Sequence, residues 1–128
     1  MNESEMNVRS AQVVDAAMRV HSALGPGLLE GAYEACLAHE LLKRGLAVAT
    51  QMSLPVVYAG VRIDLAYRVD LIVGDVVLVE LKTVSKLLPV HEAQLLSYLR
   101  LGGFRLGLLI NFHELHLKNG IKRLVNQL

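Results

Sequence analysis

Residues 76–84, VVLVELKTV, decide the fold because they combine the composition of a buried strand with two charged side chains. Successive side chains of a strand point to opposite faces of a sheet. Glu80 and Lys82 therefore share one face with Val76 and Leu78, and the intervening residues line the other face. Burying an unpaired charge costs much free energy, so buried charges are usually paired or bound to a metal. The stretch predicts an interior strand that carries a functional site.

The composition is that of one folded domain with little charged surface. The chain has 128 residues, enough for one domain with its own core and too few for two ordinary domains. Charged residues make up 20%, below the roughly 25% of a typical globular domain, and apolar residues make up 53%. We expect a second copy of the chain to cover part of this apolar surface, as in a homodimer. The net charge of +1 gives no strong attraction to nucleic acid or membranes, so nucleic-acid binding requires a local site.

The single cysteine and the N-terminal segment favour a cytoplasmic location. Cys36 alone cannot form an internal disulfide, and its place on an apolar helical stretch predicts a buried thiol. The first ten residues, MNESEMNVRS, are polar and do not resemble a signal peptide. No apolar run reaches the roughly 18 residues of a membrane span. We expect residues 1–7 to be disordered and residues 8–128 to form one domain.

Apolar periodicity and turn residues predict an α/β fold. The predicted helices span residues 8–24, 28–44 and 90–101. The predicted strands span residues 48–58, 61–73, 76–84, 104–111 and 121–125. Pro55 indicates an edge or an irregularity in the first strand. The first three strands form an antiparallel meander, and the whole order predicts a mixed sheet of about 4–5 strands flanked by helices.

Three acidic residues stand out from their surroundings. Asp70 and Glu80 interrupt apolar strands, and Glu30 lies in the first turn of the second helix, while Lys82 follows Glu80 on the same face. Mg²⁺ prefers oxygen ligands and is typically held by one or two carboxylates together with substrate phosphate. A nearby lysine orients or polarises the attacking water and neutralises charge on the phosphate. This set predicts a magnesium site that hydrolyses a phosphate ester.

The length of the hairpin loop decides whether the two strand carboxylates meet. A two-residue loop at Gly74 and Asp75 pairs Asp70 with Val79 and places Asp70 and Glu80 on opposite faces. A three-residue loop at 74–76 pairs Asp70 directly with Glu80. Three-residue loops that contain glycine are common, so we predict this second register.

The helix after this strand contributes further polar side chains. In HEAQLLSYL, Gln94 and Tyr98 are four residues apart and share a helix face. We expect the helix to lean over the face that carries Glu80 and Lys82. His91 lies beside the same site and is a candidate phosphate contact.

Five segments, taken in order, resemble the small GxxExxY family of the PD-(D/E)XK nuclease superfamily. They are Gly27-x-x-Glu30-x-x-Tyr33, YRVDLIV, VELKTV, HEAQLLSYLR and LGLLINF. The resemblance covers nearly the whole chain, although the segment after Asn111 departs from the family pattern, which bears on substrate contacts. It implies a restriction-endonuclease-like, three-layer core and cleavage of DNA or RNA with Mg²⁺ or Mn²⁺.

The resemblance also implies roles for single residues. Asp70, Glu80 and Glu30 correspond to metal ligands, and Lys82 corresponds to the catalytic lysine. Gln94 and Tyr98 match the Gln-x-x-x-Tyr element of RecB-like nucleases. We predict catalytic roles for Asp70, Glu80, Lys82 and Gln94. The predicted substrate contacts are Tyr33, Tyr98 and His91.

Other interpretations stay open at this point. Glu80 and Lys82 are also compatible with a structural ion pair, Glu30 with an acid favoured by the helix N-terminus, and both tyrosines with packing. A non-catalytic, self-associating scaffold module and hydrolysis of a smaller phosphate ester are the alternative functions. The intact Glu-x-Lys motif argues against a scaffold, because a degenerate nuclease would be expected to lose one of these charges.

Overall fold

The structure is a computed structural model that describes residues 1–127, with the side chains of residues 64–66 outside the description. Its elements are α1 (Glu3–Leu24), α2 (Glu30–Lys43), β1 (Val48–Tyr58), β2 (Val61–Val73), β3 (Val77–Lys82), α3 (Pro89–Gly102), β4 (Leu106–Asn111), a 3₁₀ turn (Leu117–Gly120) and β5 (Ile121–Val125). This order is the predicted one. In the described part of the chain, no helix is both long and apolar enough to cross a membrane.

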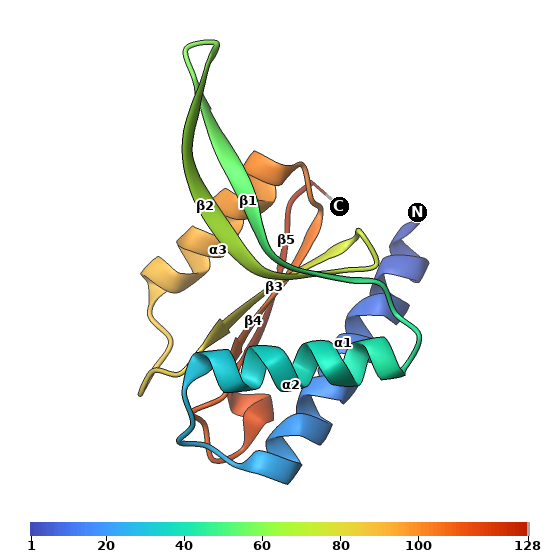
Figure 1. Ribbon diagram of the computed structural model, residues 1–128. Coiled ribbons are helices and arrows are strands. Elements are labelled where there is room, and N and C mark those ends of the chain that lie inside the picture. The colour runs from blue at the N-terminus through green and yellow to red at the C-terminus, as the bar shows by residue number, and fades with distance from the viewer. Residues whose placement is uncertain (128) are drawn as a thin grey trace.

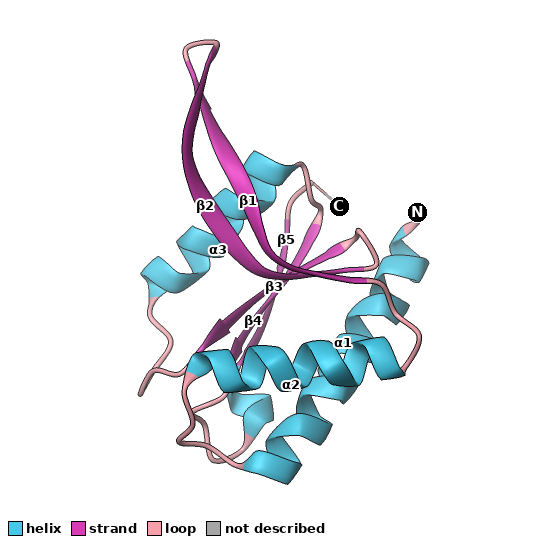
Figure 2. Cartoon of the chain, viewed as in Figure 1, coloured by secondary structure: helices cyan, strands magenta, loops and turns pink. Residues whose placement is uncertain are grey.

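Five strands of the described chain form one mixed sheet in the order β1-β2-β3-β4-β5 (Figure 2). The strands β1, β2 and β3 form the predicted antiparallel meander, and β5 is antiparallel to β4. The strand β4 runs parallel to β3, because α3 supplies the crossover that a parallel pair needs. β3 is central and buried almost throughout.

Helices cover both faces of the sheet and give three layers (Figure 1). The helices α1 and α2 pack on the face that carries Val77, Val79 and Leu81 of β3. The helix α3 packs on the face that carries Leu78. Glu80 is two residues from Leu78, so the predicted alternation along β3 is confirmed and Glu80 belongs to the α3 face.

The first helix begins at Glu3, within the segment that was expected to be disordered. The Asn2 side chain caps the helix by accepting a hydrogen bond of 2.8 Å from the Glu5 amide. Acidic residues in the first turn are favourable at the positive end of the helix dipole. Met6 is buried in the core and anchors the first turn of the helix. The polar composition of the segment gave no indication of this contact.

The helix α2 buries one narrow stripe of side chains. Tyr33, Leu37 and Leu41 are buried, whereas Cys36 is exposed, so the prediction of a buried thiol was wrong. Neighbouring helical residues lie about 100° apart around the axis, so Cys36 turns away when Leu37 faces the core.

The hairpin of β1 and β2 extends beyond the body of the molecule (Figure 1). The strand register shifts between Leu54 and Val56, which confirms the irregularity predicted at Pro55. Such a shift bends a strand and increases its twist. Beyond it, Val57, Tyr58 and Val61 are exposed.

Candidate active site

The register of β2 and β3 brings Asp70 and Glu80 to the end of the paired segment of the two strands. Leu71 pairs with Val79, and the pairing continues to the loop at residues 74–76. The predicted three-residue loop is therefore confirmed, and Asp70 and Glu80 lie next to the last pair, Leu71 and Val79. The sequence alternation and the loop length together were sufficient to predict this juxtaposition.

Backbone amides hold both carboxylates in place. Glu80 Oε1 accepts a hydrogen bond of 3.1 Å from the Asp70 amide, and Asp70 Oδ2 accepts one of 2.8 Å from the Leu81 amide. Each acid is thus oriented by the backbone of the neighbouring strand. Fixed carboxylates need little reorganisation when they bind a cation.

Glu80 is the most deeply buried acid of the site, with only 5% of its surface exposed. Burial, followed by the negative charge of Asp70, raises the pKa of Glu80 to about 8. Burial also raises the pKa of Asp70, although the hydrogen bond from Leu81 opposes this shift. The positive charge of Lys82 lowers the pKa of both acids without offsetting burial. The site therefore favours additional positive charge.

The helix α2 brings two more carboxylates to the same end of the sheet. Glu30 begins the helix, Glu34 follows one turn later, and both are half-buried. Burial is the main cause that raises the pKa of Glu30, and the charge of Asp70 raises it further. The pKa of Glu34 is raised by burial and by Asp70 as well. Glu34 was missed, and its only sequence signal is the spacing of four residues from Glu30.

Gln51 of β1 joins these acids and was also missed. The residues on either side of Gln51 pair with those flanking Asp70, so the two residues lie opposite each other. Gln51 Nε2 donates to Glu34 Oε1 and, at 3.4 Å, to Asp70 Oδ1. Its φ of 53° lies in the left-handed region, which is strained for a residue other than glycine. No sequence pattern marks a glutamine in a strand for this conformation.

A chain of hydrogen bonds links Lys82 to α3. Lys82 Nζ donates to Gln94 Oε1 over 3.1 Å, and Gln94 Nε2 donates to the Tyr98 hydroxyl over 3.0 Å. The expectation that α3 leans over the site is confirmed. The ion pairs found among the described residues involve Arg44, not Lys82, so Glu80 and Lys82 do not form the structural ion pair considered above.

Tyr98 and His91, two of the predicted substrate contacts, both make hydrogen bonds within the protein. The Tyr98 hydroxyl supports Gln94, and the residue is 5% exposed, so a direct substrate contact stays a prediction. His91 Nδ1 accepts a hydrogen bond of 2.9 Å from the Leu88 amide and caps α3. Contact between His91 and a phosphate likewise stays a prediction.

Tyr33 holds the connection between α1 and α2. The residue is 0% exposed, and its ring stacks on Phe112 with 4.5 Å between ring centroids. Its hydroxyl donates to the Gly25 carbonyl at 2.6 Å and accepts from the Leu28 amide at 3.1 Å. Burial and internal hydrogen bonds give Tyr33 a structural role, and its predicted substrate contact stays a prediction.

Replacing Tyr33 with phenylalanine should destabilise the fold without changing metal affinity. The change removes both hydroxyl hydrogen bonds and should cost about 1–3 kcal/mol. Urea denaturation measures the loss, and Tyr58→Phe at an exposed position is the control. Unchanged stability combined with weaker nucleic-acid binding would support the substrate role.

Asn111 fixes the chain that follows Lys82. It ends β4, is fully buried, and its side chain bonds both the amide and the carbonyl of Val84, at 3.1 and 2.8 Å. The Phe112 amide donates to the Lys82 carbonyl at 2.9 Å. A polar residue at the end of a buried strand was the signal that could have identified Asn111.

The oxygen-rich donor set fits a divalent cation. Among the side chains that the structure describes, no three Asp, Glu, His or Cys residues are grouped closely enough to hold a metal by themselves. Mg²⁺ usually keeps several waters and takes one or two carboxylates plus substrate phosphate. Asp70 and Glu80 meet that smaller requirement, and burial raises the pKa of both, which a bound cation would oppose.

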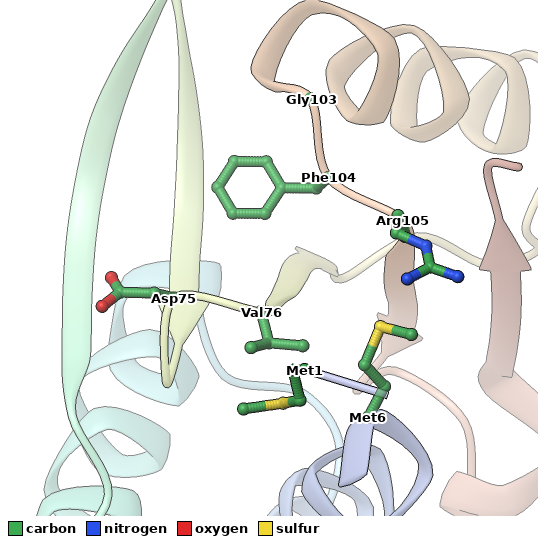
Figure 3. Close-up of a pocket in the computed structure, with 7 residues that line it drawn as sticks. All are labelled: Met1, Met6, Asp75, Val76, Gly103, Phe104 and Arg105. Carbon is green, nitrogen blue, oxygen red and sulfur yellow. The ribbon is translucent and has the colours of Figure 1, made fainter. Parts of the chain in front are cut away.

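A separate pocket lies between the N-terminus, the loop of β2 and β3 and the loop of α3 and β4. It has a volume of about 200 Å³ and is lined by Met1, Met6, Asp75, Val76, Gly103, Phe104 and Arg105 (Figure 3). None of the acids described above belongs to this lining. The pocket is therefore not part of the candidate active site.

The comparisons with known proteins agree with this geometry. A family model described as PD-(D/E)XK nuclease superfamily matches residues 7–124. No curated protein and no solved structure matches significantly. The superfamily generally uses divalent metal ions. Since the match covers nearly the whole chain, and the fold agrees with a restriction-endonuclease-like core, the chain belongs to the PD-(D/E)XK nuclease superfamily.

Proposed function

We propose that this chain is a Mg²⁺- or Mn²⁺-dependent nuclease that hydrolyses phosphodiester bonds in DNA or RNA. One observation carries the proposal: hydrogen bonds to backbone amides join the side chains of Asp70 and Glu80 across β2 and β3, and Lys82, two residues after Glu80, bonds Gln94. We further propose that it belongs to the GxxExxY family, on the spacing of Gly27, Glu30 and Tyr33.

The residues divide the chemistry between them. Asp70 and Glu80 would hold the metal, with Glu30 contributing from α2. A bound divalent ion lowers the pKa of water and stabilises charge on a phosphate. Lys82 Nζ orients the attacking water and neutralises charge on the phosphate, and Gln94 keeps the ammonium group in position.

Metal binding is the first test, because it requires no knowledge of the substrate. Calorimetry with Mg²⁺ and Mn²⁺ should show binding to the wild type and none to Asp70→Asn or Glu80→Gln. Asp75→Asn is the matched control, since Asp75 lies in the exposed turn of the same hairpin. A panel of labelled DNA and RNA then tests cleavage by the same four proteins.

Metal binding should also release protons. A carboxyl must lose its proton to bind a cation, and the pKa of Glu80 is about 8. Calorimetry at pH 7 in two buffers of different ionisation enthalpy measures this release. Binding that survives both substitutions, or cleavage that needs no divalent ion, would contradict the proposal.

A further inference from the structure

A cavity of about 520 Å³ opens between the hairpin of β1 and β2 and the helix α3. We call it the base subsite, and its lining consists of Val56, Tyr67, Gln94, Ser97, Arg100 and Leu101. Its volume lies within the range of roughly 300–1,000 Å³ that is usual for ligand pockets. The roles proposed above leave most of this lining without a function.

The base subsite is continuous with the candidate active site. Gln94 belongs to the lining, and its Oε1 accepts the hydrogen bond from Lys82. A ligand in the cavity would therefore lie next to the lysine proposed to act on the scissile phosphate. This continuity makes the cavity a place for the nucleotide adjoining that phosphate.

The lining combines an aromatic ring, apolar walls and a cation. Tyr67 is 49% exposed, and its ring rests against the buried Tyr98 with 5.5 Å between centroids, which supports it from one side. Val56 and Leu101 supply apolar surface, and the Arg100 guanidinium is exposed beside them. Proteins that bind single-stranded nucleic acid combine aromatic stacking with cationic contacts to the phosphate backbone.

We propose that the base subsite binds an unpaired nucleobase stacked on Tyr67, with Arg100 pairing to an adjoining phosphate. The inference rests on the proposed function, because Lys82 and Gln94 mark the position of the scissile phosphate. A base inside a duplex has both faces covered by its neighbours and must unstack before a side chain can stack on it. The substrate class is therefore single-stranded nucleic acid, or a duplex with an unpaired end or flap.

Fluorescence anisotropy in EDTA tests binding apart from cleavage. The probes are DNA and RNA single strands of about 12 nucleotides and the matching duplexes, a length within the usual site sizes. Single strands should bind at least tenfold more tightly than duplexes, and the tighter of DNA and RNA identifies the source of the base. Tyr67→Leu should weaken binding about tenfold or more, whereas Tyr67→Phe should retain it. Tyr58→Leu, at the exposed tip of the same hairpin, is the control and should bind as the wild type does.

Two further measurements separate stacking from a general loss of structure. A 2-aminopurine base placed in the bound strand should be quenched by the wild type and by Tyr67→Phe, but not by Tyr67→Leu. Arg100→Ala, which changes an exposed residue, should weaken binding. It should also reduce the slope of log affinity against log salt concentration by about one, which corresponds to one lost phosphate contact.

The outcomes distinguish this inference from the proposed function. Stacking and single-strand binding without cleavage would support the base subsite and contradict the nuclease activity. If the wild type cleaves with metal and the Tyr67→Leu protein binds and quenches as the wild type does, the base subsite is overturned. The nuclease activity is unaffected by that result. Equal affinity for duplex and single strand would also overturn the base subsite.

Discussion

Replacing Lys82 with alanine is expected to lower the cleavage rate about 10²- to 10³-fold while the metal still binds. This is the usual loss when a preorganised group that stabilises transition-state charge is removed. Lys82 lies two residues after Glu80 on β3, and its Nζ donates a hydrogen bond to Gln94 of α3. Its removal takes away the charge that we propose acts on the phosphate and leaves the proposed metal ligands in place.

Single-turnover cleavage at saturating Mn²⁺ measures this effect, with calorimetry as the check on metal binding. Lys86→Ala, which changes an exposed lysine on the following loop, is the matched control and should cleave at the wild-type rate. A Lys82→Ala protein that cleaves normally would remove lysine from the mechanism. Equal loss in both variants would instead indicate general electrostatic attraction of the substrate.

Replacing Glu80 with glutamine is expected to stabilise the metal-free protein at pH 8. The pKa of Glu80 is about 8 in the folded chain, against an ordinary value of 4.5. Between these values the native state holds a proton that the unfolded state has lost, so the free energy of unfolding falls as pH rises from about 4.5 to 8. Asp70, Glu30 and Glu34 shift in the same direction.

Glutamine keeps an oxygen that can accept the hydrogen bond from the Asp70 amide, and it carries no charge that must be buried. We expect Glu80→Gln to be more stable than the wild type by about 2–4 kcal/mol at pH 8 and close to it near pH 4.5. Denaturation in EDTA at both pH values measures the difference, with Asp75→Asn as the control. Added Mg²⁺ should stabilise the wild type and not the variant. A wild type equally stable at both pH values would contradict this account of Glu80.

The fold was predictable because glycine and proline residues mark its turns and helix ends. The pair Ala59-Gly60 and the loop at 74–76 form the two turns of the meander, and Pro89 and Gly103 mark the ends of α3. The strand alternation, combined with a three-residue loop, also predicted that Asp70 faces Glu80. Both inferences rest on local rules of strands and turns.

The rest depends on tertiary contacts that have no local pattern. Gln51 has a left-handed backbone, and its side chain bonds Glu34 and Asp70, which lie far from it in the sequence. Tyr33 looked like a site residue because it lies one turn from Glu30, yet it faces Phe112 in the core. Self-association and a cytoplasmic location stay predictions.

The proposed chemistry depends on one continuous piece of the chain. Asp70, Glu80, Lys82 and Gln94 lie on β2, β3 and α3, which follow one another directly. Contacts between segments close in sequence form at a low cost in loop entropy, so this part of the site is suited to early folding. Glu30 and Gln51 lie on two earlier elements, α2 and β1. Substitutions in α2 and β1 can therefore change the charge around the proposed metal site without changing the reacting groups themselves.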